Sequence, residues 1–163
     1  MKKPTPPNST KEARQVVVQN RRARHEYHII DTVEAGLVLV GTEVKSLRQG
    51  NVNLVDAFAR IEDGEAWLYE MHVAPYEHGS RWNNDPRRPR KLLLHRREID
   101  RLRGLVQRKG YTLIPLSVHF RNGYAKVELA LAAGKRLYDK REAIAKRDLE
   151  REVARELQSR RRH

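Results

Sequence analysis

The residues best suited to chemistry form a basic stretch close to the N-terminus. This stretch brings together Arg21, Arg22, Arg24, His25 and Tyr27. A guanidinium group binds phosphate through paired hydrogen bonds, while imidazole and phenol rings can stack on unpaired bases. The combination predicts contacts with folded or single-stranded RNA. For the tyrosine alone, packing within the first strand is the alternative explanation.

The charge of the whole chain also indicates a polyanionic partner. Its 163 residues include 34 Lys and Arg against 21 Asp and Glu, which gives a formal net charge of +13 and a pI near 10.4. Hydrophobic residues make up 39% and charged residues 34%, enough for one core but not for a core that includes every position. We therefore expect one compact domain with part of the chain outside it.

Residues that could catalyse a reaction or bind a metal lack the required spacing. The chain has no cysteine, and its seven histidines do not occur in a metal-ligand pattern. It also has no nucleophile elbow and no glycine-rich phosphate loop. The carboxylates Asp56, Glu62 and Asp63 lie among many cations, so we interpret them as surface ion pairs. The sequence predicts no enzyme activity, no metal and no cofactor.

The apolar runs are too short to indicate a membrane segment. No run approaches the roughly 20 residues that span a bilayer. The first residues are rich in proline and polar side chains, unlike a secretory signal. We expect a cytoplasmic protein with no membrane partner.

Two hairpins are the clearest structural predictions. Asp63-Gly64 separates the β-prone runs 57–61 and 66–69, and Asn122-Gly123 separates 116–120 from 124–129. Both dipeptides favour a type I′ turn, in which the two central residues have positive φ. The run Leu37–Val40 is apolar at every position and predicts a further, well-buried strand.

Helical signals interrupt the strands at two places. Ile99, Leu102 and Val106 recur at helical spacing within 96–109, and Gly110 is placed to end that helix. A shorter helix is expected from an N-cap at Thr42 through residue 48. Short strands with two helices favour a small, OB-like β-barrel. We divide the chain into a basic flexible arm (1–19), the barrel (20–133) and a basic C-terminal tail (134–163), either disordered or helical.

The tail has charged and apolar residues on separate faces if it is helical. Arg147, Arg151 and Arg155 then repeat at intervals of four, and apolar side chains line another face. Like charges at this spacing repel, and a few apolar contacts do not offset the entropy of ordering. We expect the tail to order on a partner, with a solvated charged helix as the alternative.

Four blocks of sequence, in order, resemble the SsrA-binding protein family, also called small protein B. The spacing of these blocks matches that of the family from about residue 20 to residue 151. The blocks are Asn20–Tyr27, Glu34-Ala35-Gly36 leading to Gly41–Arg48, Arg90–Leu94 and Gly134–Arg141.

This resemblance implies a fold, a function and partners. The fold would be a six-stranded antiparallel OB-like barrel flanked by helices, in a protein that acts as a monomer. It would bind the elbow of the transfer-RNA-like domain of transfer-messenger RNA and catalyse no reaction. With elongation factor Tu and GTP, it would deliver the charged RNA to a stalled ribosome. The tail would enter the empty messenger-RNA channel of the small subunit, with residues 138–141 near the decoding centre.

Three further residues fit RNA recognition, each with a simpler alternative. Glu34 could accept hydrogen bonds from a guanine edge or form a salt bridge to a nearby lysine. Strand alternation should point Lys126 toward a phosphate, although an exposed lysine needs no function. Leu93 could face outward and pack on a splayed base, or all three leucines 92–94 could be buried.

Residues and resemblance together define two predicted sets. The RNA-binding set is Asn20, Arg21, Arg22, Arg24, His25, Tyr27, Glu34, Lys45, Arg48, Arg90, Leu93 and Lys126. The ribosome-contacting set is Lys135, Tyr138, Asp139, Lys140, Arg141, Lys146, Arg147 and Arg151. Two other functions remain open: a binder of single-stranded nucleic acid, which would need aromatics spread over one sheet face, and a metal-dependent nuclease.

Overall fold

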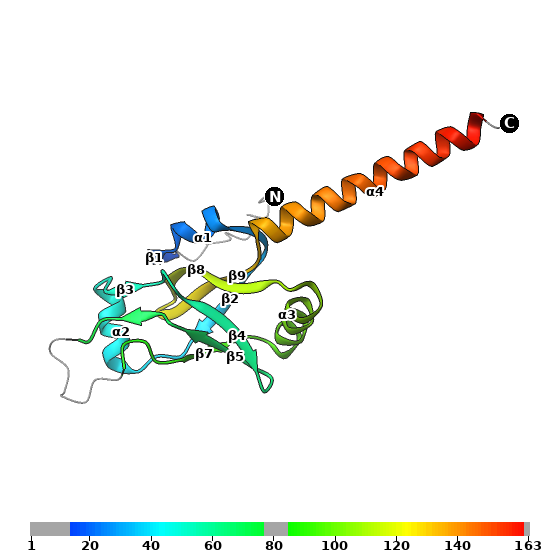
Figure 1. The fold of residues 1–163 in the computed structure, drawn as a ribbon. Helices are drawn as coiled ribbons and strands as arrows, with labels where there is room; N and C mark the ends of the chain where they lie inside the picture. The colour runs from blue at the N-terminus through cyan, green and yellow to red at the C-terminus, as the bar shows by residue number, and fades with distance from the viewer. Residues whose placement is uncertain (1–13, 77–84, 162–163) are drawn as a thin grey trace, which may run out of the picture.

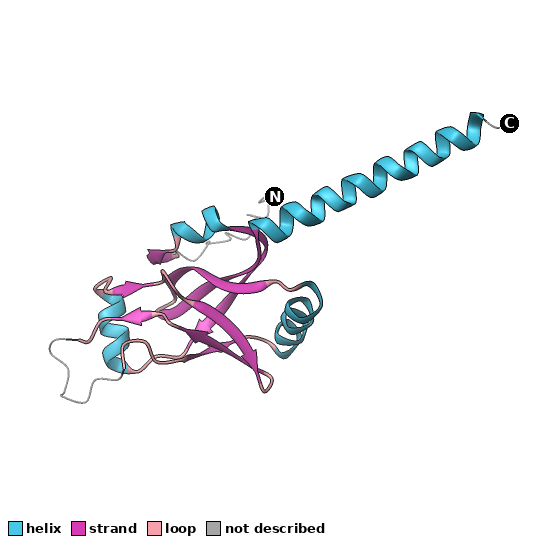
Figure 2. Cartoon of the chain, viewed as in Figure 1, coloured by secondary structure: helices cyan, strands magenta, loops and turns pink. Residues whose placement is uncertain are grey.

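An antiparallel β-sheet with helices at its edges forms the body of the protein (Figures 1 and 2). The computed structural model describes residues 14–76 and 85–161. In chain order the elements are β1 (Gln15–Gln19), α1 (Arg21–Glu26), β2 (Tyr27–Leu37), α2 (Gly41–Arg48), β3 (Val52–Asn53), β4 (Phe58–Glu62), β5 (Glu65–Tyr69), β6 (His72–Val73), β7 (Arg90–Leu93), α3 (Arg96–Lys109), β8 (Thr112–Arg121), β9 (Tyr124–Gly134) and α4 (Lys135–Arg161).

The strand order brings distant segments side by side. The main sheet runs β1-β8-β4-β5-β7-β2-β9, and β8 pairs with β9 as well. A separate pair, β3 and β6, lies outside it. All of these pairings are antiparallel. The predicted antiparallel β fold with flanking helices and a C-terminal helix is confirmed.

Both predicted hairpins are present. Asp63 and Gly64 have φ of 50° and 75°, and Asn122 and Gly123 have φ of 52° and 78°. Positive φ at both central positions matches the right-handed twist of the paired strands, which explains the dipeptides found there. The turns connect β4 to β5 and β8 to β9.

The predicted helix at 96–109 is α3, and Gly110 ends it with a φ of 67° and an N–H that donates to the Val106 carbonyl. The predictions for residues 37–42 were wrong in two details. β2 ends at Leu37, and Val38 and Val40 are exposed rather than buried in a strand. Residue 40, not Thr42, is the N-cap of α2, because the Glu43 side chain accepts its backbone N–H at 3.1 Å.

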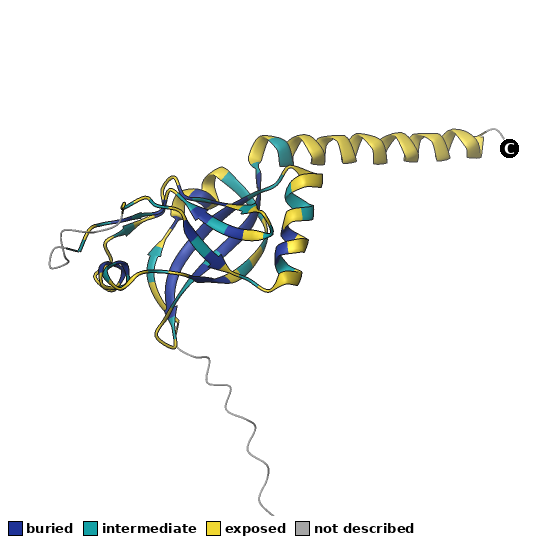
Figure 3. Ribbon diagram, turned by 90° about the horizontal axis from the view of Figure 1, so that it is seen from below, coloured by how far each residue is buried: buried dark blue, intermediate teal, exposed yellow. Residues whose placement is uncertain are grey.

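The core lies between the inward faces of the sheet (Figure 3). Leu68, Val118, Leu129 and Leu131 are completely or almost completely buried there. A smaller cluster packs Ala23 of α1 against residues of β8 and β9. α1 is therefore attached to the sheet, and the exposed side chains of this short helix are held close to the sheet surface.

Strand β1 extends the sheet into the segment expected to be an arm. Residues 15–19 pair with β8, with Gln19 opposite Ser117. The segment has three consecutive valines, and β-branched residues favour strands. Residues 1–13 of the predicted arm lie outside the described part of the chain.

The tail forms the long helix α4, which projects away from the sheet (Figure 1). Almost all of its residues are exposed, as the yellow of the helix beyond its first turn in Figure 3 shows. It is helical, one of the two forms predicted for the tail, and the expectation that a partner orders it stays a prediction. The segment lacks proline and is rich in Ala, Leu, Glu, Lys and Arg, which are strong helix formers.

Candidate nucleic-acid interface

Strand register brings two predicted RNA-binding residues, Leu93 and Lys126, to the two sides of Gly36. Gly36 on β2 lies opposite Leu93 on β7 and opposite Lys126 on β9. Leu93 is 55% exposed, whereas Leu92 is buried, so the outward alternative holds for Leu93. A Cβ at residue 36 would come within 3.0 Å of the Leu93 Cβ. The glycine therefore lets the leucine lie flat across β2.

Glu34 lies beside this row and forms a salt bridge to Arg121 rather than to a lysine. Its Oε2 is 3.0 Å from the His119 Nε2 and 3.0 Å from the Arg121 Nη2. A third of its side chain remains exposed. We call Glu34, Leu93, His119, Arg121 and Lys126 the Glu34 surface.

His119 is the completely buried member of this surface. Burial lowers its pKa, and Arg14 and Arg121 act in the same direction, while the hydrogen bond and charge of Glu34 oppose them. The net direction is downward, so the imidazole is neutral near pH 7 and its Nε2–H donates to the carboxylate. Its Nδ1 and the Arg121 Nε have no partner among the described residues.

A second carboxylate adjoins the Glu34 surface. Glu128 lies directly opposite Glu34 in the β2–β9 register, and two like charges in this position repel. Arg14 compensates, because its Nη2 lies 2.5 Å from the Glu128 Oε2 and 2.6 Å from the Ser117 Oγ. Burial raises the pKa of Glu128, but the hydrogen bonds and charge of Arg14 lower it below its ordinary value.

Helix α1 carries its basic residues to the border of this network. Arg21 and Arg24 line a cavity of about 460 Å³ together with Arg14 and Glu128. Both are exposed, as is His25. The basic N-terminal stretch and the Glu34 surface therefore approach one another across β8 and β9, as a joint RNA contact requires.

The structure gives Asn20 a folding role. It is buried, and its side chain caps α1 by accepting the Ala23 N–H while its amide donates to the carbonyls of Leu54 and Pro115. Its own N–H donates to the Leu116 carbonyl at 2.7 Å. These bonds leave it poorly placed to contact RNA directly.

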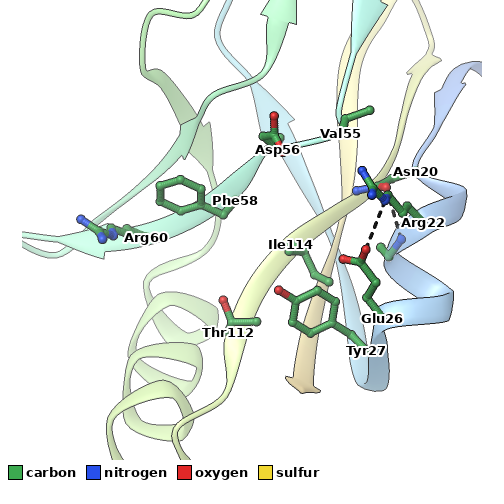
Figure 4. Close-up of a pocket in the computed structure, with 12 residues that line it drawn as sticks. Asn20, Arg22, Glu26, Tyr27, Val55, Asp56, Phe58, Arg60, Thr112 and Ile114 are labelled. Carbon is green, nitrogen blue, oxygen red and sulfur yellow. Dashed lines mark hydrogen bonds and ion pairs between the residues drawn. The ribbon is translucent and has the colours of Figure 1, made fainter. Parts of the chain in front are cut away.

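Arg22 and Tyr27 lie on the other side of α1, along a cavity of about 440 Å³ (Figure 4). Arg22 pairs with Glu26 at 3.1 Å. Across the cavity are Phe58 and Arg60 of β4. Tyr27 is half-buried against the smaller hydrophobic cluster, as the packing alternative predicts.

Arg90 is inside the protein, which does not fit the predicted RNA contact. Its side chain is fully buried, and its Nε and Nη2 lie 2.7 and 2.6 Å from the Glu43 Oε2. The remaining N–H groups donate to the carbonyls of Met71, Pro86 and Arg88. Because every donor has a protein acceptor, no group is left for a phosphate.

The other basic residues of the predicted set are on α2. Lys45 and Arg48 are exposed. The Lys45 ammonium lies 5.3 Å from the centre of the Tyr76 ring, and the Arg48 guanidinium lies 5.0 Å from that of Phe120. These contacts hold two cations on the outside of the domain.

The predicted ribosome contacts near the start of α4 touch the domain itself. The Tyr138 ring stacks on His28 with 4.1 Å between centres, and the His28 Nε2 is 3.7 Å from an Asp139 oxygen. Arg141 lies over the Tyr111 ring and donates to the Lys109 carbonyl at the end of α3. The others of the set, Lys135, Lys140, Lys146, Arg147 and Arg151, are exposed.

Several residues of the interface were not predicted. His119, Arg121 and Arg14 complete it, and Tyr124, 71% exposed and opposite Arg121, extends it at the β8–β9 turn. Strand alternation around Asn122-Gly123 could have placed Arg121 and Tyr124 on the same face as Lys126. Within 14–76 and 85–161, no group of three or more His, Asp or Glu is arranged to hold a metal, and no helix is long and apolar enough to cross a membrane.

The fold and this surface define a small antiparallel β protein with a basic exterior. The family model for "SmpB protein" matches residues 17–159. An SsrA-binding protein of Desulforudis audaxviator is 64% identical over 145 residues, 89% of this chain and 95% of the relative. One from Acidothermus cellulolyticus is 61% identical over 144 residues, covering 88% and 91%. The chain belongs to the SmpB family.

A solved structure is similar to this chain in fold as well as in sequence. It is described as "tmRNA-SmpB: a journey to the center of the bacterial ribosome" and is 59% identical in sequence. The match covers 72% of this chain and 83% of the other, with a TM-score of 0.62. The resemblance to the SsrA-binding proteins that the sequence motifs indicated is confirmed.

Proposed function

We propose that this protein binds the transfer-RNA-like domain of transfer-messenger RNA and delivers it to stalled ribosomes. The observation that carries the proposal is the Glu34 surface, where register places a carboxylate, an outward leucine and a lysine side by side on adjoining strands. A carboxylate reads base amino groups, a leucine packs on a splayed base and a lysine binds phosphate. The relatives named as SsrA-binding proteins support the choice of RNA.

The fold proposed for this role is a six-stranded OB-like barrel. The pairings support it, because β8-β4-β5-β7-β2-β9 returns to β8 and each of these strands has two neighbours. The proposed domain spans residues 20–133, with residues 1–19 as an arm and 134–163 as a tail. The protein would work in the cytoplasm as a monomer, with elongation factor Tu and GTP as indirect partners through the charged RNA.

Within the RNA-binding set, the exposed residues are the best supported. These are Glu34, Leu93, Arg21, Arg22, Arg24, His25, Lys45 and Arg48, and the partly exposed Lys126 joins them through its place in the Glu34 surface. Tyr27 is half-buried and would contribute one edge. Asn20 would act by holding α1 in place.

The tail would probe the messenger-RNA channel of the small subunit. α4 supports this role because it is a single exposed helix of 27 residues, about 40 Å long at 1.5 Å per residue. Its basic side chains would face ribosomal RNA, and Tyr138, Asp139 and Arg141 would lie near the decoding centre.

A competition assay tests the RNA proposal. Labelled transfer-RNA-like domain is bound by the full chain and competed with bulk transfer RNA, for wild type, Glu34→Gln and the control Glu98→Gln on α3. We expect Glu34→Gln to lose about 1 to 3 kcal/mol of affinity with the control unchanged. Equal competition by bulk transfer RNA contradicts the proposal.

The same RNA also tests the two alternative functions, a metal-dependent nuclease and a binder of single-stranded nucleic acid. Incubation with the protein and Mg²⁺ should leave the RNA intact if the protein delivers it, whereas cleavage would support a nuclease. A preference for unstructured RNA over the folded domain would instead support a general single-strand binder.

A further inference from the structure

The imidazole of His119 lies on the same face of β8 as the exposed charges of the Glu34 surface, yet it has no contact with solvent. His119 is directly opposite Lys126 in the β8–β9 register, and Arg121 is two residues further along β8. Directly opposed residues share a face of an antiparallel sheet, as do residues two apart on one strand. Lys126 and Arg121 are partly exposed, whereas His119 is completely buried. The imidazole is therefore covered by its neighbours on this face.

Two donors reach the same oxygen of Glu34. The His119 Nε2 lies 3.0 Å from the Glu34 Oε2, and the Arg121 Nη2 lies 3.0 Å from the same atom. The other oxygen, Oε1, accepts no hydrogen bond from the part of the chain that the structure describes. The carboxylate thus has one oxygen held by the protein and one oxygen free for an external donor.

The two contacts on Oε2 differ in how far water screens them. The ion pair with Arg121 joins side chains that are 37% and 33% exposed, and pairs of this kind contribute little. The hydrogen bond from His119 starts from a ring with no exposed surface, where the low local dielectric strengthens it. His119 is therefore the stronger restraint on the direction of the Glu34 carboxylate.

The ring also carries a polar atom that the fold leaves unsatisfied. The Nδ1 of His119 is buried without a hydrogen-bond partner among the described residues. Because Nε2 carries the proton that Glu34 accepts, Nδ1 is an unpaired acceptor, and a buried unpaired acceptor destabilises a fold. An apolar side chain would fill the same space without this destabilisation. Packing alone does not explain an imidazole here, whereas a donor directed at Glu34 does.

Glu34 reaches His119 across an intervening strand. β9 pairs with β2 on one side and with β8 on the other, so the side chain from β2 crosses β9 to meet the ring on β8. On β9 itself, Glu128 lies directly opposite Glu34, and like charges in this position repel. Without a donor on β8, that repulsion would turn the Glu34 carboxylate away from β9.

We propose that His119 is a positioning residue for RNA recognition, which holds the Glu34 Oε2 so that Oε1 faces the RNA. This inference rests on the proposed function and deepens it. An oxygen fixed in direction accepts a base amino group without the loss of freedom that a mobile carboxylate would suffer on binding. His119 itself would touch no RNA, because it is completely buried.

A double-mutant cycle tests the proposal in the full-length chain. Wild type, His119→Leu, Glu34→Gln and the double variant are titrated with labelled transfer-RNA-like domain. We expect His119→Leu to weaken binding about 3- to 10-fold, the effect of one lost hydrogen bond. In the Glu34→Gln background the same change should cause no further loss. There, His119 would hold the amide oxygen and so turn the amide nitrogen, a donor, toward the RNA.

Two further variants separate positioning from folding. His119→Gln keeps an N–H donor at the end of the side chain, so it should retain most of the wild-type affinity. Val118→Ala removes buried volume from the neighbouring residue, which faces the other side of β8. It should lower the melting temperature without lowering the affinity. Melting curves show which variants are folded at the assay temperature.

Proton–nitrogen NMR of the imidazoles reads the hydrogen bond without RNA. The signals of His119 are those absent from the spectrum of His119→Gln. At pH 7 we expect a proton on Nε2 and none on Nδ1, and Glu34→Gln should shift these signals. A proton on Nδ1 instead overturns the proposal, because Nε2 could then not donate to Glu34.

The outcomes distinguish this inference from the proposed function. If wild type shows no preference for the transfer-RNA-like domain over bulk transfer RNA, the proposed function fails and the inference fails with it. Two results would overturn the positioning role alone, with that preference intact. One is an equal loss for His119→Leu with and without Glu34→Gln, and the other is an affinity of His119→Gln as low as that of His119→Leu.

Discussion

Replacing Glu43 by glutamine should unfold the protein at markedly lower denaturant concentration. The Glu43 side chain is only 7% exposed. Its carboxylate faces the guanidinium of Arg90, whose side chain has no exposed surface. Arg88 and the Val40 N–H also donate to it. Glu43→Gln keeps the shape but leaves the arginine charge without a counter-charge.

The magnitude follows from that burial. Removing one partner of a buried ion pair costs about 3 to 5 kcal/mol. For a chain of this size, that corresponds to a fall in melting temperature of about 6 to 20 °C. Urea unfolding at pH 7 measures the loss, with Glu65→Gln as control, because Glu65 forms an exposed pair with Lys91 that contributes less than about 1 kcal/mol.

Acid titration adds a second readout with a defined sign. Burial raises the pKa of Glu43, but hydrogen bonds from Arg88 and Val40 and the charge of Arg90 lower it below its ordinary value. Its contribution to stability is therefore complete above about pH 4.3 and is lost as the pH falls through the lower, folded value. Wild type should lose stability in that range, and Glu43→Gln should lose less. A variant within 1 kcal/mol of wild type at pH 7 would refute this reasoning.

Three other variants test single contacts. Gly36→Ala should displace Leu93, whose Cβ would be 3.0 Å from the new one, and so weaken binding of the transfer-RNA-like domain in a filter assay. Gly134→Ala, which meets nothing within 4 Å, should not. Gly110→Ala places a side chain at φ 67° and should cost about 1 kcal/mol in thermal unfolding, against little for Gly41→Ala. His28→Ala removes the stack on Tyr138 and should speed amide hydrogen exchange in the first turns of α4, whereas His25→Ala, an exposed residue of α1, should not.

The local elements could be predicted because their signals are local. Asp63-Gly64 and Asn122-Gly123 determine their turns through backbone conformation alone, and Gly110 ends α3 in the same way. The helical spacing of apolar residues located the helix at 96–109, because this signal also lies within the element itself. Local signals could not predict the end of β2. Leu37 and the exposed Val38 have the same apolar character and differ only in what packs on them.

The full interface could not be predicted from the sequence, because residues far apart in the chain form it. Glu34 and His119 are 85 positions apart, and only the β8–β9–β2 register brings them together. Arg90 shows the opposite problem, because a basic residue in a basic block resembles an RNA ligand until its counter-charge is known. Glu43, 47 positions away, supplies that charge from α2.

The contacts at the start of α4 fix its direction only weakly. An aromatic stack contributes about 0.5 to 1.5 kcal/mol, an exposed cation–π contact about 0.5 to 1 kcal/mol, and an exposed pair such as His28–Asp139 no more than about 1 kcal/mol. Tyr138, Asp139 and Arg141 use these contacts to attach the helix to the domain. Under the proposed function the same side chains face the decoding centre, so a ribosomal contact for Tyr138 must replace the His28 ring. Because the ring contributes so little, a ribosomal base that stacks on Tyr138 can replace the His28 contact without unfolding either part. Release of the helix from the domain also requires Arg141 to leave the Tyr111 ring and the Lys109 carbonyl.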